Sequence, residues 1–308
     1  MHMTTFQTTI LGSSGAMPTS TRHTSTQLLQ HSNKYYLLDC SEGAQMQLRR
    51  LNLPIMKINH IFITHMHGDH YLGLPGLLFT YHLLGRKKEL HIYSPPGLEK
   101  IIKIQFDICN LELSFKINYH ELYKGEEMIF EDAAITIETI KMLHSIPAFG
   151  FLFREKPAEP NIKKEYVEKY SLPAKKIREI KAGASYTTPE GMKLSNEELT
   201  IAPPLPRAYA FTSDTAYTES FIDQIKGANM LYHEATFKDK FAELAKEKLH
   251  ATTKQAAAVA VKSEVKKLLI GHYSARYDDS ELDFYLDEAQ AVFSNTLRAE
   301  EKKTYNIE

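Results

Sequence analysis

The sequence lacks the features that would place it in an oxidising compartment or in a membrane. Among its 308 residues only Cys40 and Cys109 are cysteines, so no framework of disulfide bonds holds the fold, which suits a reducing cytosol. No apolar run approaches the roughly 18 residues that a membrane span needs. Residues 1–9 contain no basic region followed by an apolar stretch, which is the pattern of a secretory signal. We therefore expect a soluble, cytoplasmic protein without a membrane partner.

A surplus of charge of one sign is also missing. The chain carries 37 basic and 38 acidic side chains, which gives a formal net charge of −1. A polyanionic partner would have to be held by a local basic patch, because the molecule as a whole does not attract it. Hydrophobic residues make up 43% of the chain, enough for a sizeable core. The length fits one large domain or two small ones.

Histidine is abundant, and its densest cluster lies in residues 64–70 (THMHGDH), directly after the apolar run 61–63. Alternate side chains of a strand share one face, so the first two histidines of the cluster can point to one site. A turn at the glycine could direct the following Asp-His pair to a second site. Imidazole and carboxylate groups are ligands that zinc, manganese and iron accept. The alternative, a loop of solvated histidines, is disfavoured by the apolar lead-in.

The same pattern, an apolar strand with an ionisable residue just past its end, recurs along the chain at Asp39, His65 to His70, Asp214, His233-Glu234 and His272. Strand ends gather along one edge of an α/β sheet, where such folds build their sites. Together these residues predict a site for two metals that activate water against a phosphodiester, a strained amide or a thioester. For Asp39 two roles stay open: it could orient a metal-bound histidine or cap the following helix.

Local patterns predict several elements of structure. These are a strand at 35–39, helices at about 44–51, 254–262 and 281–299, and a hairpin or meander at 131–142. Residues 12–19 (GSSGAMPT) follow a predicted strand and could cradle a phosphate. Because no Lys-Thr pair follows, a structural turn is the favoured interpretation there.

Basic residues are concentrated between Arg154 and Lys181, a segment that contains nine basic residues and five glutamates. One interpretation is an arm that grips a phosphate backbone with a salt-dependent affinity. The other is a solvated, charged insertion of the surface. If the segment is a nucleic-acid-binding arm, its candidate contacts are Lys163, Lys164, Lys169, Lys175, Lys176, Arg178 and Lys181.

The histidine cluster is similar to the His-x-His-x-Asp-His signature of the metallo-β-lactamase superfamily. More narrowly, the chain resembles the ribonuclease Z family of tRNA 3′-processing endonucleases. The resemblance rests on segments in the family's order: 72–77 (LGLPGL), 147–150 (PAFG), 212–215 (TSDT), 233–236 (HEAT), 250–253 (HATT) and 272–277 (HYSARY). It implies the α/β class with a metallo-β-lactamase fold, a four-layer αβ/βα sandwich. It further implies one domain, residues 1–308, with a flexible tRNA-binding arm inserted at about 154–200.

The resemblance also implies two zinc ions per subunit, for which manganese or iron could substitute. Seven side chains would hold them: His65, His67 and His144 one ion, Asp69, His70 and His272 the other, and Asp214 both. Asp69 would also act as general base, and Asp39 would orient a ligand from behind. Glu234 and His250 would form the pair that protonates the leaving 3′-oxygen.

Thr252 and Arg276 would bind a phosphate of the substrate, since arginine suits a bidentate phosphate contact. The chain departs from the family's pattern at two points. It has His-Ala-Thr at 250–252 where the family usually has His-Ser-Thr, and residues 172–176 (LPAKK) lack the Gly-Pro-rich tip of the family's arm.

The implied activity is a zinc-dependent endoribonuclease that removes the 3′ trailer of precursor tRNA and leaves a 3′-hydroxyl on the tRNA. It would act as a homodimer, the arm of one subunit holding tRNA for the site of its partner. Two alternatives stay open. One is a small-molecule phosphodiesterase or arylsulfatase-like hydrolase of the same superfamily, which the basic arm disfavours. The other is a catalytically silent RNA-binding relative, which the intact ligand set disfavours.

Overall fold

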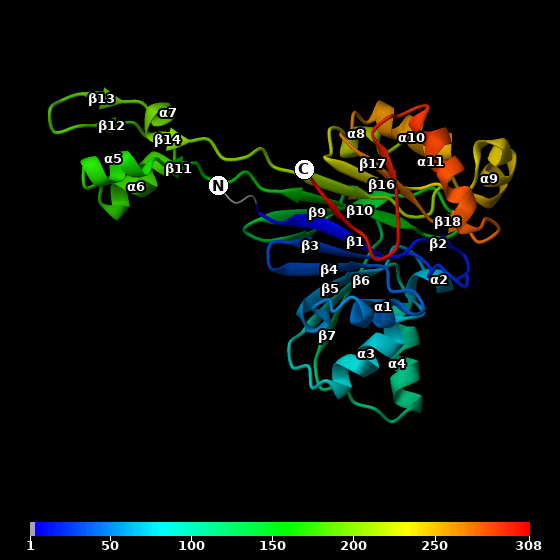
Figure 1. The fold of residues 1–308 in the computed structure, drawn as a ribbon. Coiled ribbons are helices and arrows are strands. Elements are labelled where there is room, and N and C mark those ends of the chain that lie inside the picture. Colours follow the sequence, from blue (N-terminus) through cyan, green and yellow to red (C-terminus); the bar gives the residue numbers. More distant parts are fainter. Residues whose placement is uncertain (1–3) are drawn as a thin grey trace. The chain divides into compact units, whose positions relative to one another are not determined.

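The computed structural model describes residues 4–308, which form two compact units (Figure 1). The first, here called the main unit, contains the described residues up to Phe130, together with Ile137–Phe153 and Arg207–Glu308. The second, here called the arm unit, contains Glu131–Thr136 and Arg154–Pro206.

Two seven-stranded sheets form the centre of the main unit. In spatial order, the first consists of β20 (Thr304–Asn306), β1 (Phe6–Gly12), β3 (Thr26–His31), β4 (Lys34–Leu38), β5 (Ile58–Phe62), β6 (Leu90–Ser94) and β7 (Ile117–Glu121). The second consists of β19 (Thr296–Arg298), β17 (Leu268–Gly271), β16 (Met230–Glu234), β15 (Ala208–Phe211), β10 (Phe149–Glu155), β9 (Ile135–Lys141) and β8 (Met128–Glu131). A short parallel pair, β2 (Ser14–Gly15) and β18 (Tyr273–Ser274), joins two loops.

Helices cover the outer faces of both sheets, so the main unit has four layers (Figure 1). On the first sheet lie α1 (Ala44–Arg50), α3 (Leu74–Leu83) and α4 (Leu98–Ile108), and on the second α8 (Ile222–Ile225), α10 (Thr253–Lys262) and α11 (Leu282–Gln290). Shorter helices lie in the connections: α2 (Gly68–Tyr71), α9 (Ala242–Lys248) and the 3-10 turns η1 (Ile55–Lys57), η2 (Asp239–Phe241) and η3 (Asp279–Glu281). None of the helices within residues 4–308 has the length and hydropathy that would let it cross a membrane.

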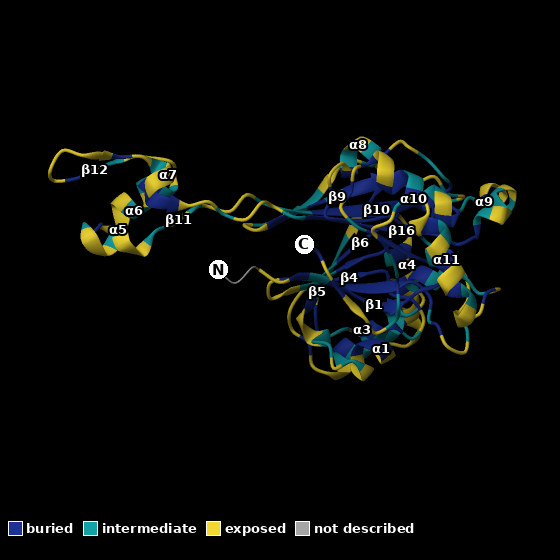
Figure 2. Ribbon diagram, turned by 45° about the horizontal axis from the view of Figure 1, so that its top comes forward, coloured by how far each residue is buried: buried dark blue, intermediate teal, exposed yellow. Residues whose placement is uncertain are grey.

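The core fills the space between the layers (Figure 2). Between the sheets, the ring of Phe62 packs against Phe151 and Phe153 with centroid distances of 5.1 and 5.7 Å. Under α10, the buried Ala256 and Ala260 have small side chains that let the helix lie close to the second sheet.

The central strands of the second sheet position the site. β15, β16 and β17 run parallel and are buried along their whole length, so their sequences are apolar almost throughout, as is typical of strands covered on both faces. Glu234 at the end of β16 is in register with Gly271 at the end of β17. The residues that follow these strands therefore emerge along one edge of the sheet.

The arm unit has a small core of its own. Leu172, Ile180, Leu194 and Leu199 are buried there, and tyrosine rings pack around them. Its elements are α5 (Lys164–Lys169), α6 (Ala174–Lys181), α7 (Asn196–Leu199) and the paired strands β11 (Asn161–Ile162) with β14 (Thr200–Ile201) and β12 (Tyr186–Thr187) with β13 (Lys193–Leu194).

Candidate metal centre

Turns at the carboxyl ends of four strands deliver the site residues. Asp39 follows β4, residues 64–70 follow β5, Asp214 follows β15 and His272 follows β17. Asp39 and His272 have positive φ angles of 57° and 59°, a left-handed conformation in which Asp and His occur more often than most residues. The chain thus turns sharply at the strand end, and the side chains stay at the edge of the sheet.

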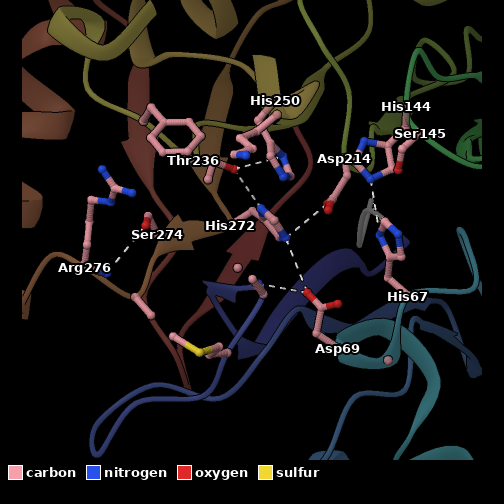
Figure 3. Close-up of a pocket in the computed structure, with 17 residues that line it drawn as sticks. His67, Asp69, His144, Ser145, Asp214, Thr236, His250, His272, Ser274 and Arg276 are labelled. Atoms are coloured by element: carbon pink, nitrogen blue, oxygen red, sulfur yellow. Dashed lines mark hydrogen bonds and ion pairs between the residues drawn. The ribbon is translucent and has the colours of Figure 1, made fainter. Parts of the chain in front are cut away.

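Three imidazoles converge on the first candidate position. The Nε2 atom of His65 lies 3.0 Å from Nδ1 of His67. Nε2 of His144 lies 3.3 Å from the same atom of His67 (Figure 3). His144 comes from the connection between β9 and β10, and its Nδ1 donates to the Leu249 carbonyl (3.1 Å), which leaves Nε2 as the ligand atom. Burial, reinforced by the nearby His70, lowers the pKa of His65, which favours the neutral ring that a metal ligand requires.

The second candidate position is formed by Asp69, His70 and His272. The Oδ2 atom of Asp69 lies 3.3 Å from Nε2 of His70 and 3.8 Å from Nε2 of His272. Asp214 lies between the two groups. Its Oδ1 is 3.1 Å from Nε2 of His272 (Figure 3). Its Oδ2 is 3.7 Å from Nε2 of His65. A single carboxylate therefore faces both positions.

Groups behind the ligands orient the imidazoles. Nδ1 of His70 donates to Oδ2 of Asp39 (2.7 Å), and Asp39 also accepts from the backbone N–H of Thr64 (2.8 Å). The helix α1 begins after Gly43 without a side-chain cap, so Asp39 orients a histidine and does not cap this helix. Nδ1 of His272 lies 2.8 Å from the Thr236 hydroxyl. Both rings thus turn Nε2 toward the centre.

The donor set fits divalent cations. The Nε2 atoms of His70 and His272 are buried and face the carboxylates of Asp69 and Asp214, without a well-formed hydrogen bond to any described residue. A buried carboxylate such as Asp214 is costly unless it is paired with positive charge. Within each of the two groups the ligand atoms lie within 4.8 Å of one another, and nitrogen and carboxylate oxygen are donors that zinc, manganese and iron accept.

Glu234 and His250 form an ion pair at the edge of the centre. The Nδ1 atom of His250 lies 2.8 Å from Oε1 of Glu234, which also accepts from the backbone N–H of Thr215 (2.9 Å). Burial of the imidazole opposes protonation, but the Glu234 carboxylate outweighs it and raises the pKa of His250 to about 9. The ring is therefore protonated at neutral pH, and because Nδ1 is held by Glu234, Nε2 can donate a proton.

Five of the seven candidate ligands (His67, Asp69, His144, Asp214 and His272) line one cavity of about 670 Å³ together with His250 (Figure 3). Its walls include His67, Asp69, His250 and Arg276. The guanidinium group of Arg276 lies 5.3 Å from the ring centre of Phe237, and it forms no ion pair with any residue that the structure describes. The cavity thus brings together candidate metal ligands, an imidazole paired with a carboxylate and an arginine without an ion pair among the described residues, a set of groups that could act on a phosphodiester.

Comparisons with known proteins give the family. The ribonuclease Z of Bacteroides fragilis (strain YCH46) is 42% identical over 300 residues, which cover 97% of this chain and 98% of the relative. The ribonuclease Z of Phocaeicola vulgatus is 42% identical over 307 residues, which cover 99% of both chains. The chain belongs to the ribonuclease Z family. Residues 6–163 also match the family model described as Anti-Pycsar protein Apyc1.

Solved structures agree with this family and with its fold. Human tRNase Z, short form, superimposes with a TM-score of 0.73 at 26% identity, covering 98% of this chain and 99% of the human chain. The metallo-β-lactamase fold protein YhfI of Bacillus subtilis gives a TM-score of 0.69 at 17% identity, covering 98% of this chain and 99% of that chain. The predicted metallo-β-lactamase fold and the resemblance to ribonuclease Z are both confirmed.

Thr252, for which the resemblance to ribonuclease Z implied a phosphate contact, is the N-cap residue of α10. It is fully buried at the start of α10, where its hydroxyl accepts from the backbone N–H of Gln255 (3.3 Å) in a capping box. The same hydroxyl donates to the Asp239 carboxylate (3.4 Å). The hydroxyl is thus engaged by groups of the chain itself, and the phosphate contact of Thr252 stays a prediction.

The basic side chains of the arm unit differ in how they are engaged. Lys164 pairs with Glu168 and Lys176 with Glu179. Others touch uncharged groups: Lys163 donates to the backbone carbonyl of Glu198 (2.6 Å), and Lys169 lies over the ring of Tyr170. Among the residues described, no acidic group forms an ion pair with Lys175, Arg178 or Lys181.

Two residues that shape the site, Thr236 and Ala16, have no role predicted from the sequence. Thr236 lies in the His-Glu-Ala-Thr segment, yet only the structure shows its hydroxyl between His272 and Glu234. Ala16 belongs to the stretch interpreted as a turn, and its backbone N–H donates to Oδ2 of Asp69 (2.9 Å). Neither contact has a local signal, because both join segments far apart in the chain.

Proposed function

We propose that this chain is a metal-dependent endoribonuclease that removes the 3′ trailer of precursor tRNA and leaves a 3′-hydroxyl on the tRNA. Membership of the ribonuclease Z family supports the substrate class. The single observation that carries the chemistry is that His250, bonded to Glu234, lines the same cavity as the candidate metal ligands. An alkoxide such as the ribose 3′-oxygen is a poor leaving group and benefits from a proton donor.

Two metal ions, zinc by preference, would be held by seven side chains: His65, His67, His144, Asp69, His70, His272 and Asp214. When bound, such a pair lowers the pKa of a water molecule and stabilises charge on the phosphate oxygens. Asp214 would neutralise part of the positive charge between the two positions, and Asp39 would keep the His70 ring in its orientation.

Asp69 would accept the proton of the attacking water. One of its oxygens is fixed by the Ala16 N–H, and its side chain lines the cavity, so the carboxylate is oriented before substrate arrives. On the other side of the scissile bond, His250 would donate its proton to the departing 3′-oxygen. Glu234 would hold the ring in place and stabilise its protonated form.

Arg276 would bind the scissile phosphate or its neighbour. Its guanidinium group lines the cavity without a competing carboxylate among the described residues, and the rings of Phe237 and Phe241 support it from one side. The cations of α6 without an ion pair among the described residues would contact the tRNA backbone. We further propose a cytoplasmic homodimer, which sedimentation of the purified protein would test.

The decisive experiment offers the purified protein a labelled precursor tRNA with a 3′ trailer and, separately, bis(p-nitrophenyl) phosphate. Metal content is measured on the same sample. We expect bound divalent metal, cleavage of both substrates and a 3′-hydroxyl at the mature end of the tRNA. Cleavage of the small diester alone would favour a small-molecule phosphodiesterase or another hydrolase of this superfamily. A protein that binds tRNA but holds no metal would favour the silent relative.

A further inference from the structure

The loop from Ser13 to His23, here called the 13–23 loop, contacts the proposed metal ligands directly. The backbone N–H of Ala16 donates to Oδ2 of Asp69 (2.9 Å). Gly15 lies so close to the His272 ring that a Cβ atom at this position would come within 2.6 Å of it. The loop therefore sets the positions of one carboxylate and one imidazole of the metal centre.

The conformation of the loop requires an outside restraint. Ala16 has a positive φ angle of 62°, which alanine rarely adopts because its Cβ atom clashes with the backbone. Such strain persists only where the surrounding structure holds the backbone in place. The residues that hold the loop in place therefore also help to position Asp69 and His272.

Glu301 closes the base of the loop from outside the cavity. Its Oε1 accepts from the backbone N–H groups of Ser13 (3.3 Å) and His23 (2.6 Å), which are the two ends of the loop. Its Oε2 lies 3.0 Å from Nδ1 of His23 and accepts from Nε2 of Gln47 (3.1 Å). Both oxygens are thus used, and the side chain is only 9% exposed.

A second set of hydrogen bonds joins the 13–23 loop to the segment that contains Arg276. The buried Arg22 donates from Nη1 to Asp279 and from Nη2 to the Tyr277 carbonyl, each at 2.6 Å. These hydrogen bonds do not involve Glu301. The backbone N–H groups of Ser13 and Ser14 also donate to the His23 carbonyl (each 2.9 Å). Loss of the Glu301 carboxylate would therefore loosen the base of the loop without opening it, while Arg276 stays anchored.

We infer that Glu301 is a positioning residue of the metal centre, which acts on Asp69 and His272 through the 13–23 loop. This inference rests on the proposed function, because it takes both residues as metal ligands. Partners that orient a metal ligand from behind are typically worth 10–100-fold in metal affinity or activity. Glu301 would have such an effect although it neither lines the 670 Å³ cavity nor belongs to the candidate metal ligands.

The test compares Glu301→Ala and Glu301→Gln with wild type. The matched control is Glu300→Gln, because Glu300 is the adjacent glutamate and pairs with Lys303 and Arg298 instead of the loop. Zinc affinity is measured by competition with a chromophoric chelator, and kcat and KM with bis(p-nitrophenyl) phosphate. We expect zinc affinity and kcat to fall about 10–100-fold in Glu301→Ala, with little change in KM. Glu301→Gln should lie between, because one oxygen can still accept both backbone N–H groups.

Thermal unfolding establishes that each variant is folded, and if Glu301→Ala does not fold, Glu301→Gln decides. Wild-type zinc affinity and kcat in the folded Glu301 variants would overturn the inference alone. Equal losses in the Glu300→Gln control would also overturn it, because the effect would then not depend on the loop. A wild-type protein that neither binds zinc nor hydrolyses either substrate would overturn the proposed function, and the inference with it.

Discussion

At the scale of single residues, a change at His250 tests protonation of the leaving oxygen separately from attack by water at the metal site. The His250→Ala change removes the proton donor but none of the seven proposed metal ligands. We expect kcat for precursor tRNA to fall about 10²- to 10⁴-fold, the usual contribution of a general acid. Hydrolysis of bis(p-nitrophenyl) phosphate should change little, because p-nitrophenolate leaves without being protonated.

The two substrates serve as controls for each other, and metal content checks that the centre is intact in the variant. Equal losses on both substrates would contradict the assignment of His250 as proton donor. They would instead indicate that the ring helps to hold a metal, since its position beside Asp214 and His272 also permits that role.

How much of the site could be predicted depends on whether a residue's role is local. The histidines of residues 64–70 follow one strand within seven positions, so spacing alone indicates that they converge. Thr252 and Thr236 are the opposite case. The role of Thr252 depends on where α10 begins, and that of Thr236 on the strand that brings His272 beside it. Neither fact is encoded near the residue.

At the scale of elements, the helix α6 carries the clearest prediction about tRNA. We expect the triple change Lys175→Gln, Arg178→Gln and Lys181→Gln to weaken tRNA binding at least about tenfold near 0.1 M salt. The dependence of the affinity on salt should also become shallower, because fewer phosphates are neutralised. Filter binding over a series of salt concentrations measures both quantities.

Neutral glutamine avoids placing acidic groups at the carboxyl end of α6, where the helix dipole would disfavour them. Ile180, which anchors the helix in the arm unit's small core, stays unchanged. The control variant removes the same charge from exposed lysines of the main unit: Lys57, Lys87 and Lys88. If that control weakens tRNA binding as much as the α6 variant does, the effect reflects net charge and the arm has no special role.

Elements were predicted well where the pattern is local and poorly where pairing is distant. The predicted helices at about 44–51 and 254–262 correspond to α1 (Ala44–Arg50) and α10 (Thr253–Lys262). The helix predicted over 281–299 is wrong beyond Gln290, because Thr296–Arg298 forms β19. That strand exists because it pairs in parallel with β17, a contact that no amphipathic pattern can reveal.

At the scale of the whole molecule, the metal centre gathers residues from both sheets, so metal binding should stabilise the fold. Residues 64–70 follow a strand of the first sheet, whereas Asp214 and His272 follow strands of the second. A cation that binds only the folded chain adds about 2.7 kcal/mol at a free concentration 100 times its Kd. The carboxylates and buried imidazoles that it holds together come from distant parts of the chain, which unfolding separates.

We therefore expect removal of metal with a chelator to abolish cleavage of both substrates and to lower the melting temperature by several degrees. Zinc added back should restore both properties, and calorimetry with and without zinc measures the change. The Asp214→Ala variant is the matched control, because it lacks the carboxylate that faces both metal positions. Its melting temperature should respond much less to zinc. A wild-type protein that loses activity on chelation but melts at the same temperature would contradict this expectation, because the unfolded chain would then have to bind the cation about as tightly as the folded one.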